Sequence, residues 1–401
     1  MSVSTPTATP VRFPWAAMSA LGLSVFACVS SEFLPTGMLP EMSADLDVPQ
    51  SSIGFLVTVW AFTVVILATP LSLLTRRFSR KGILVAAVAL FAISNVIAAV
   101  SVNYAMLFGS RIVGGVSNAL FWMVAMAYVS HLLPSELHSR GFLFVSGGAN
   151  LAFIVGLPLS SFIAHSMNWR IGFLVMAAAT LLAGALLWVF LAPVDHDYDD
   201  AHPDATAPWR DRSFGPVMIV VGITFLVVAA HNVFYPFIKP FLLDRAAFSA
   251  DEASGVLALY GIGGVAGIFV AWWLGRNPAH LVRNLIAAII FLGIAMLAVR
   301  FAAPEPVIVI AATMAWSAAF SIADPLYGQL MMTTASARIR DFASALRTTA
   351  WNLGIGTGAF LGSLALVPWG VGALPYMGAA LAVLGAALAI VPLVRARRVS
   401  R

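Results

Sequence analysis

Long apolar blocks separated by short polar segments limit what this chain can fold into. The block GILVAAVALFAISNVIAAVSV at residues 82–102 contains no charged side chain, and similar blocks recur along the sequence. A helix of about 20 residues crosses the roughly 30 Å hydrocarbon core of a bilayer. We therefore predict twelve membrane-spanning helices, at residues 15–38, 51–74, 82–102, 105–130, 140–164, 169–192, 214–238, 252–274, 284–302, 306–333, 341–364 and 373–394.

The composition agrees with an all-helical membrane protein. The chain is 61% hydrophobic and 10% charged, whereas soluble domains carry about 25% charged residues. A transmembrane barrel needs strands of about ten residues with alternating polarity, and the unbroken apolar blocks exclude it. The predicted fold class is an all-α membrane protein with twelve transmembrane helices.

The basic residues gather in loops that fall on one side of the membrane. They include Arg76, Arg77, Arg80, Lys81, Arg140, Arg276, Arg283, Arg338, Arg340 and the tail residues Arg395, Arg397, Arg398 and Arg401. Cytoplasmic loops carry an excess of Lys and Arg, so we expect both termini to be cytoplasmic. The net charge of +5 follows from this bias, and we expect no nucleic-acid partner.

An acidic segment divides the chain in two. Residues 193–213, PVDHDYDDAHPDATAPWRDRS, are almost free of aliphatic side chains, which is typical of a solvated linker. The predicted domains are therefore an N-terminal six-helix half at 1–192 and a C-terminal six-helix half at 214–401, joined by a cytoplasmic linker.

The two halves carry a weak internal repeat. SGGANLAFIVGLPLSS in the fifth predicted helix is similar to RTTAWNLGIGTGAFLGS in the eleventh, and Asn150 and Asn352 each stand six residues before a glycine. The repeated features lie about 200 residues apart. Repeats of this kind indicate a transporter whose site lies between the halves, near the middle of the membrane.

Five segments in order resemble the major facilitator superfamily over essentially the whole chain. The segments are SEFLPTGMLPEMSADLDV, RIVGGVSNALFWMVA, GLPLSSFIAHSMNWRIGF, HNVFYPFIKPFL and DFASALRTTAWNLGIGTGAFLGS. More closely, the chain resembles the twelve-helix drug and sugar proton antiporters, in the sugar/arabinose efflux permease and chloramphenicol exporter branches. The loop SLLTRRFSRKG departs from them, because it lacks the acidic residue of the superfamily's gating motif.

The resemblance implies a major facilitator fold of two pseudo-symmetric halves and a place in the cytoplasmic membrane of a bacterium. It implies a secondary active efflux transporter, which exchanges protons for sugars or sugar-like small molecules by alternating access. One alternative is a multidrug or chloramphenicol-type exporter. A more remote alternative is a proton symporter that imports a small polar solute.

Two acidic residues, Glu32 and Asp324, lie well inside apolar blocks. Ionisable groups inside a membrane are costly and mark functional sites by default. We therefore name Glu32 and Asp324, together with His231 of the seventh predicted helix, as proton-coupling candidates. The alternative for Glu32 is a structural carboxylate at the Pro35 kink. For Asp324 it is an ion pair with Arg347 or Lys239.

Polar and aromatic residues inside the spans are candidates for substrate binding. Arg111, which the resemblance places in the cavity facing the first helix, is expected to pair with Glu32, to bind a polar substrate or to form a structural ion pair. His231, Tyr235 and Lys239 recur every four residues and share a helical face. The substrate-binding candidates are Arg111, Asn118, Trp122, Asn150, Tyr235, Trp316, Tyr327, Trp351 and Asn352.

No enzyme motif competes with this interpretation. The sequence has neither H-E-x-x-H nor G-x-S-x-G. Its lysines are Lys81 and Lys239 alone, which excludes a P-loop. We predict a non-enzymatic protein with no catalytic residue, cofactor or metal, driven by the proton gradient. Its expected partners are a small-molecule substrate, protons and the lipid bilayer, and we expect a monomer.

Overall fold

The computed structural model describes residues 13–75, 77–134, 137–193, 207–303 and 305–399. Within these ranges, twelve helical segments are long and apolar enough to cross a membrane, and no strand occurs. Each overlaps one of the twelve predicted spans, so the predicted fold class is confirmed. The first helix is longer than predicted, because it continues past residue 38 to Asp45.

The N-terminal half contains α1 to α7. Their bounds, with the π-helix η2, are α1 Trp15–Asp45, α2 Gln50–Leu74, α3 Arg80–Ala99, α4 Tyr104–Leu132, α5 His138–Leu151, η2 Ala152–Gly156, α6 Leu157–Ser166 and α7 Trp169–Phe190. The C-terminal half contains α8 to α14. Their bounds, with the short 3₁₀ turns, are η3 Pro208–Arg210, α8 Phe214–Asn232, η4 Tyr235–Phe237, α9 Ile238–Asp244, α10 Ala250–Gly275, η5 Pro278–His280, α11 Leu281–Ala302, α12 Pro306–Thr334, η6 Ala337–Ile339, α13 Arg340–Trp369, η7 Val371–Ala373 and α14 Leu374–Val399.

Two predicted helices are not continuous. The span predicted at 140–164 contains the π-helix η2, and the span predicted at 214–238 breaks between α8 and η4. A proline follows each irregularity or lies within it, Pro158 and Pro236 respectively. Proline has no amide hydrogen and its ring clashes with the carbonyl four residues earlier, so the backbone bonding shifts at these points.

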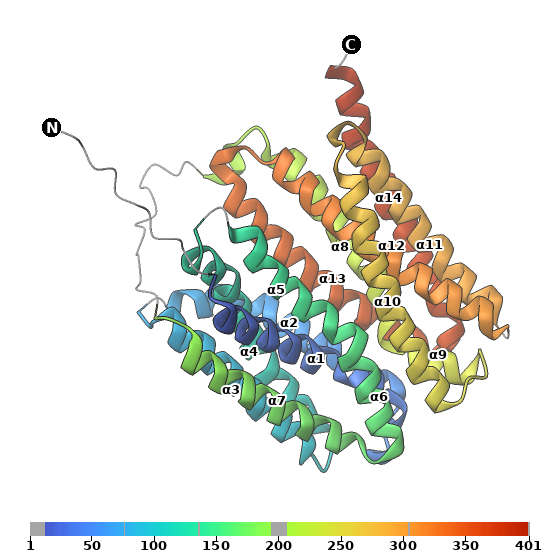
Figure 1. Cartoon of the computed structure of the whole chain (residues 1–401). Coiled ribbons are helices and arrows are strands. Elements are labelled where there is room, and N and C mark those ends of the chain that lie inside the picture. Colours follow the sequence, from blue (N-terminus) through green and yellow to red (C-terminus); the bar gives the residue numbers. More distant parts are fainter. Residues whose placement is uncertain (1–12, 76, 135–136, 194–206, 304, 400–401) are drawn as a thin grey trace.

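The helices of each half pack mainly on one another, and the two groups lie side by side (Figure 1). We call the end of the bundle that carries the turns at 46–49 and 245–249 the closed end. The other end, where α1 begins and α14 finishes, is the terminal end. Contacts between the halves gather toward the closed end, where α6 and η2 meet α10 and where α1 meets α9 and η4.

Side-chain contacts across the interface between the two halves, which we call the seam, agree with this placement. Ser254 of α10 donates to Ser161 of α6 at 2.9 Å, and Thr58 of α2 donates to the Gly356 carbonyl of α13 at 3.0 Å. Phe55 of α2 lies beside Phe360 of α13, with ring centroids 6.1 Å apart, on the parts of these helices nearer the closed end. The halves are therefore joined at that end in this conformation.

Gly261 allows α10 to approach the backbone of η2 across the seam. A Cβ atom at this position would lie 2.6 Å from Ile154 Cα and 2.7 Å from the Phe153 carbonyl oxygen. Backbone atoms cannot move aside as a flexible side chain can. Close approach of the halves at the closed end therefore depends on the absence of a side chain here.

We expect Gly261→Ala to weaken the joined state of the closed end by about tenfold, because overpacking costs about 1–3 kcal/mol. The reporter is the thiol labelling rate of Ser161→Cys in a Cys28→Ala background, since Cys28 is the chain's one cysteine and Ser161 is buried at the seam. Labelling is expected to accelerate. Gly255→Ala is the matched control on the same helix, because a Cβ there meets nothing within 4 Å. Equal labelling in both variants would contradict the prediction.

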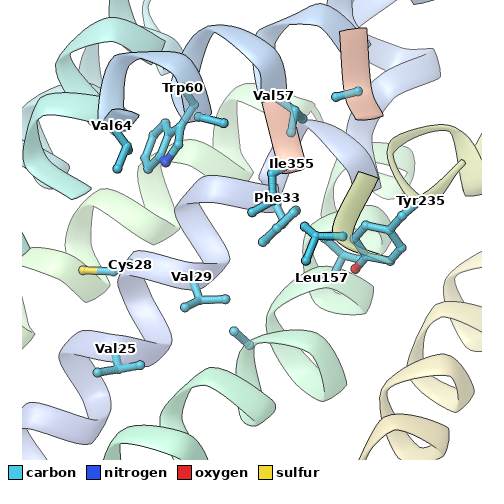
Figure 2. Close-up of a cluster of buried hydrophobic side chains, with 14 of the residues drawn as sticks. Val25, Cys28, Val29, Phe33, Val57, Trp60, Val64, Leu157, Tyr235 and Ile355 are labelled. Atoms are coloured by element: carbon cyan, nitrogen blue, oxygen red, sulfur yellow. The ribbon is translucent and has the colours of Figure 1, made fainter. Parts of the chain in front are cut away.

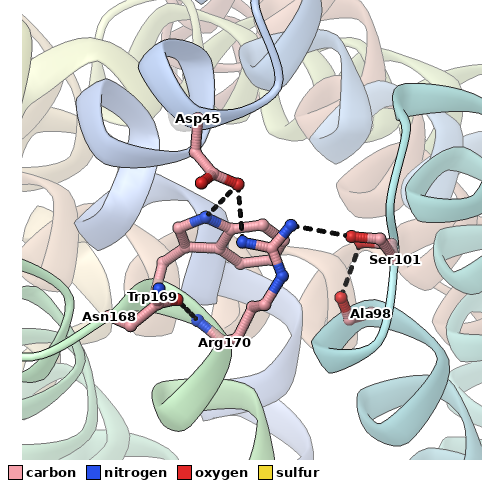
Figure 3. A network of polar contacts seen from close by, with 6 residues as sticks. All are labelled: Asp45, Ala98, Ser101, Asn168, Trp169 and Arg170. Carbon is pink, nitrogen blue, oxygen red and sulfur yellow. Dashed lines mark hydrogen bonds and ion pairs between the residues drawn. The ribbon is translucent and has the colours of Figure 1, made fainter.

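A polar network fixes the closed end of the N-terminal half (Figure 3). Arg170 of α7 pairs with Asp45 of α1 at 2.5 Å and donates to the Ser101 carbonyl at 2.9 Å. Trp169 Nε1 donates to the same carboxylate at 3.2 Å. The network ties the end of α1 and the start of α7 to the turn between α3 and α4, so these three segments are held together.

The predicted linker lies largely outside the described residues, which resume at 207. At its described end, Asp211 accepts hydrogen bonds from the Ser213 hydroxyl at 2.6 Å, the Ser213 amide at 2.8 Å and the Ser336 hydroxyl at 2.8 Å. These hydrogen bonds, first those from Ser213, lower the pKa of Asp211. The end of the linker is thereby anchored to the turn between α12 and α13.

Candidate functional site

Arg111 supplies the hydrogen bond that Pro35 removes from α1 and adds a second one. Pro35 cannot donate to the carbonyl of Ser31, four residues earlier. Arg111 Nη1 donates to that carbonyl at 3.0 Å, and Nη2 donates to the backbone carbonyl of Glu32 at 2.6 Å. An unsatisfied carbonyl inside a membrane costs several kcal/mol, so the guanidinium stabilises the kinked helix.

The same side chain is enclosed on its other sides. Arg111 is 1% exposed, and its guanidinium carbon lies 4.1 Å from the ring centroid of Trp60. Asn95 of α3 donates to the Ser31 hydroxyl at 2.9 Å. Arg111 is thus bound to the backbone of α1 and to a ring of α2. Its hydrogen bonds go to main-chain carbonyls, not to the Glu32 carboxylate.

The Glu32 carboxylate stands inside an apolar stretch of α1. The residue is 6% exposed, and its near neighbours along the helix include Cys28, Val29 and Phe33 (Figure 2). Among the described residues it forms no ion pair, although the charge of Arg111 acts on it. Glu32 is therefore a buried acid whose charge no direct partner compensates.

Five aromatic or imidazole rings gather in the C-terminal half, and we call them the ring cluster. His231 of α8 stacks on Phe320 of α12 with centroids 3.8 Å apart, and on Tyr235 of η4 at 4.9 Å. Tyr260 Oη of α10 lies 3.2 Å from His231 Nε2, and the Trp316 ring of α12 lies 5.4 Å away. Three other elements, α10, α12 and η4, thus converge on one histidine of α8.

Several polar atoms of the ring cluster have no hydrogen-bond partner within the described residues. They are His231 Nδ1, Tyr235 Oη and Trp316 Nε1. Asn118 Oδ1, in the N-terminal half, is buried in the same way. Buried polar groups in proteins are almost always hydrogen-bonded, so these atoms give the middle of the bundle an unmet capacity to bind polar groups.

The ring cluster meets the N-terminal half through Phe33 and Phe153. The Phe33 ring of α1 lies 5.7 Å from Tyr235 and 5.3 Å from Phe153 of η2. Figure 2 shows Phe33 with side chains of both halves, Leu157 from α6 and Ile355 from α13 among them. Phe33 and Glu32 are consecutive residues of α1, so their side chains leave the helix about 100° apart, and the buried acid shares a helix with the ring that joins the halves.

Asp324 pairs with Arg347 and not with Lys239. Arg347 Nη1 donates to Asp324 Oδ1 at 3.2 Å. Tyr327 lies one turn away on the same helix, and its ring is 6.4 Å from Trp351. Three of the predicted residues, Asp324, Tyr327 and Trp351, therefore lie near one another on α12 and α13.

Asn150 and Asn352 make the same local interaction in the two halves. Asn150 donates to the Ser146 carbonyl at 2.7 Å, and Asn352 donates to the Thr348 carbonyl at 3.1 Å, each four residues back. Both side-chain amides therefore donate a hydrogen bond within their own helix. Trp122 packs against Phe121, its neighbour in sequence, at 5.6 Å, and it has no ring contact with the ring cluster among the described residues.

From the sequence, Lys239 was named only as an alternative partner of Asp324, and its actual partner was not identified. Lys239 is instead 0% exposed and donates across the seam, to Glu41 Oε1 at 2.6 Å and to the Gly37 carbonyl at 2.9 Å. Pro40, inside α1, removes the amide that would bond the carbonyl of Thr36, one residue before Gly37. A second proline in α1 was the available signal, but it does not reveal a partner 198 residues away.

Comparison with known proteins agrees with this architecture. The family profile of the Major Facilitator Superfamily matches residues 21–359. The chain is 28% identical over 372 residues to a probable sugar efflux transporter of Helicobacter pylori (strain G27), with 92% of each chain covered.

The fold is also similar to a solved structure. This is the crystal structure of a bacterial homolog of the human lysosomal transporter Spinster, in an inward-facing and unoccupied conformation. The TM-score is 0.73 at 15% identity, covering 96% of this chain and 97% of the other. The resemblance found in the sequence motifs is thus confirmed, and this chain belongs to the Major Facilitator Superfamily of membrane transporters.

Proposed function

We propose that this protein is a secondary active exporter that exchanges protons for sugars or sugar-like small molecules. The observation that carries the proposal is the burial of Glu32, an acid without an ion pair among the described residues, on α1, the helix whose Phe33 contacts Tyr235 of the ring cluster. A group that exchanges protons and a surface that binds substrate then meet at the seam between the halves. The name of the Helicobacter pylori relative supports sugar efflux.

The ring cluster suits a small polyhydroxylated molecule. Aromatic faces pack against the C–H faces of a sugar ring, and a few placed polar atoms fix its orientation. Trp316 and Tyr235 offer both, since each has an aromatic face and a polar atom without a partner among the described residues. His231 adds to this aromatic surface because its ring stacks on Phe320 and Tyr235. Its imidazole is also a second candidate for carrying the proton.

Glu32 is the proposed proton carrier. A carboxyl group that no direct partner compensates can alternate between its neutral and charged forms as the surroundings change. Arg111 holds the α1 carbonyls beside it, so the acid is kept in place while the halves move. Uptake of a proton from one side and release on the other would couple the gradient to export.

Alternating access would use the seam described above. We propose that the joined closed end faces away from the cytoplasm, so that this conformation opens inward, as the crystallised Spinster homolog does. Both termini and the linker would then be cytoplasmic, in a monomer in the cytoplasmic membrane of a bacterium. The two six-helix halves would rock against each other around the central site.

A second candidate is an exporter of planar drugs such as chloramphenicol. The observation that favours it is the stacking of His231 on Phe320 with an interplanar angle of 14°, since a planar arene would extend such a stack. Sugars stay the first choice, because the unpartnered polar atoms of the ring cluster match several hydroxyl groups.

Transport by the purified protein in liposomes with an imposed pH gradient tests the proposal. We expect arabinose or isopropyl thiogalactoside to drive proton movement, and we expect a protonophore to abolish sugar accumulation. Response to chloramphenicol alone would favour the drug exporter. Sugar flux that ignores the pH gradient would contradict proton coupling, and accumulation of sugar together with protons would indicate symport.

A further inference from the structure

We infer that Asp324 and Arg347 form a second binding subsite, which holds hydroxyl groups of a neutral sugar at the terminal end of the central site. The inference rests on the proposed function for the class of substrate. It departs from the sequence-based hypothesis that Asp324 couples protons. The pair is joined by one hydrogen bond, Arg347 Nη1 to Asp324 Oδ1 at 3.2 Å.

The exposure of the pair indicates a surface that polar molecules can reach. The Arg347 side chain is 33% exposed and the Asp324 side chain is 39% exposed, although both residues lie within helices of membrane-spanning length. Charged side chains within such helices almost always face the bundle interior or a water-filled cavity. The partly exposed pair is therefore best placed on the open side of the seam, between the halves.

Ring contacts connect the pair to the ring cluster. Arg347 lies one helical turn before Trp351 on α13, and Asp324 lies one turn after Phe320 on α12. The Trp351 ring is 5.7 Å from Phe320, whose ring stacks on His231 at 3.8 Å. A continuous set of aromatic faces thus leads from the terminal end to the buried histidine.

The chemistry of the pair matches hydroxyl groups on adjacent carbons. A guanidinium has five N–H donors and a carboxylate has about four acceptor positions, so one shared hydrogen bond leaves both groups able to bind further. Their charges compensate each other, which favours a neutral ligand over an anion or a cation. Trp351, one turn away, provides an aromatic face for the C–H side of the same ring.

Equilibrium binding of radiolabelled arabinose and isopropyl thiogalactoside to the purified full-length protein tests the subsite. We expect Asp324→Asn and Arg347→Gln each to weaken binding about tenfold, which is about 1.4 kcal/mol, because each change removes a hydrogen bond between the sugar and a charged group. The double variant is expected to bind no more weakly than the weaker single variant, since both changes act on one subsite. The ratio of protons to sugar transported is expected to stay unchanged in Asp324→Asn.

Two further variants guard against misfolding. Arg347→Lys keeps the positive charge and the ion pair but loses the forked donors, so weaker binding is expected with unchanged thermal stability. Asp45→Asn alters a partly exposed ion pair at the closed end and is expected to leave binding unchanged.

The outcomes separate the two proposals. Wild-type binding with no loss in the Asp324 and Arg347 variants would overturn the subsite and leave the proposed function standing. Loss of proton coupling with normal binding in Asp324→Asn would also overturn the subsite and would return Asp324 to a proton-coupling role. Absence of binding of either sugar to the wild-type protein would overturn both proposals.

Discussion

Glu32→Gln is expected to abolish substrate-driven proton movement in liposomes while sugar binding and sugar-for-sugar exchange continue. Glutamine keeps the shape of the side chain and its hydrogen-bonding capacity but cannot take up or release a proton. The measurement is proton flux on addition of arabinose, compared with exchange of labelled for unlabelled arabinose across the same membrane. Flux at the level of protein-free liposomes, with exchange retained, is the expected result.

The geometry explains why this substitution acts on coupling and not on folding. The bonds that hold α1 at its kink run from Arg111 to the backbone carbonyls of Ser31 and Glu32, so they remain when the carboxylate is replaced. Burial of a neutral amide in place of an acid also removes a cost of desolvation. The variant is therefore expected to unfold no more easily than the wild type.

Glu305→Gln is the matched control, because Glu305 is an exposed acid at the start of α12. It is expected to change neither proton flux nor exchange. Normal proton flux in Glu32→Gln would show that Glu32 is a structural carboxylate, and the role of proton carrier would then be assigned to His231 or Asp324. Loss of exchange as well as flux would show that Glu32 binds the sugar itself.

The spans could be predicted from sequence because bilayer thickness fixes the length of an apolar helix. The helix irregularities could not. Pro35 and Pro325 lie within continuous helices, whereas Pro158 and Pro236 accompany a π-helix and a 3₁₀ turn. The outcome depends on what replaces the lost hydrogen bond, and for Pro35 the replacement is an arginine on another helix.

The polar members of the candidate site were visible in the sequence because charged or hydrogen-bonding groups are rare in apolar blocks. Their aromatic partners were not. Phe320 stacks on His231, while Phe269 on α10 is 69% exposed, and both stand in similar apolar surroundings in the sequence. Contacts between helices decide which phenylalanine belongs to the site, and a single sequence does not contain them.

Lys239→Met is expected to open the closed end. The change leaves Glu41, whose Oε2 atom is already buried and unpartnered within the described residues, without its cation. Loss of one member of a buried ion pair costs about 3–5 kcal/mol, which corresponds to about a hundredfold or more in an equilibrium constant. The labelling rate of Ser161→Cys in the Cys28→Ala background is expected to rise by about this factor, and sugar export is expected to fall because the inward-open state is depleted.

Removal of both Lys239 and Glu41 distinguishes two effects of Lys239→Met. One is the loss of the ion pair itself, and the other is the buried Glu41 carboxylate that is left without a cation. Lys239→Met combined with Glu41→Met leaves neither charge of this pair behind, and apolar replacements of ion pairs are often neutral or stabilising. This double variant is expected to restore slow labelling at Ser161→Cys but not export, because the ion pair breaks and re-forms in the proposed alternating-access cycle and a seam held by apolar contacts alone lacks it. Slow labelling in Lys239→Met itself would show that the seam is held by its packing, at Gly261 and Phe33, and that the ion pair follows the movement of the halves without controlling it.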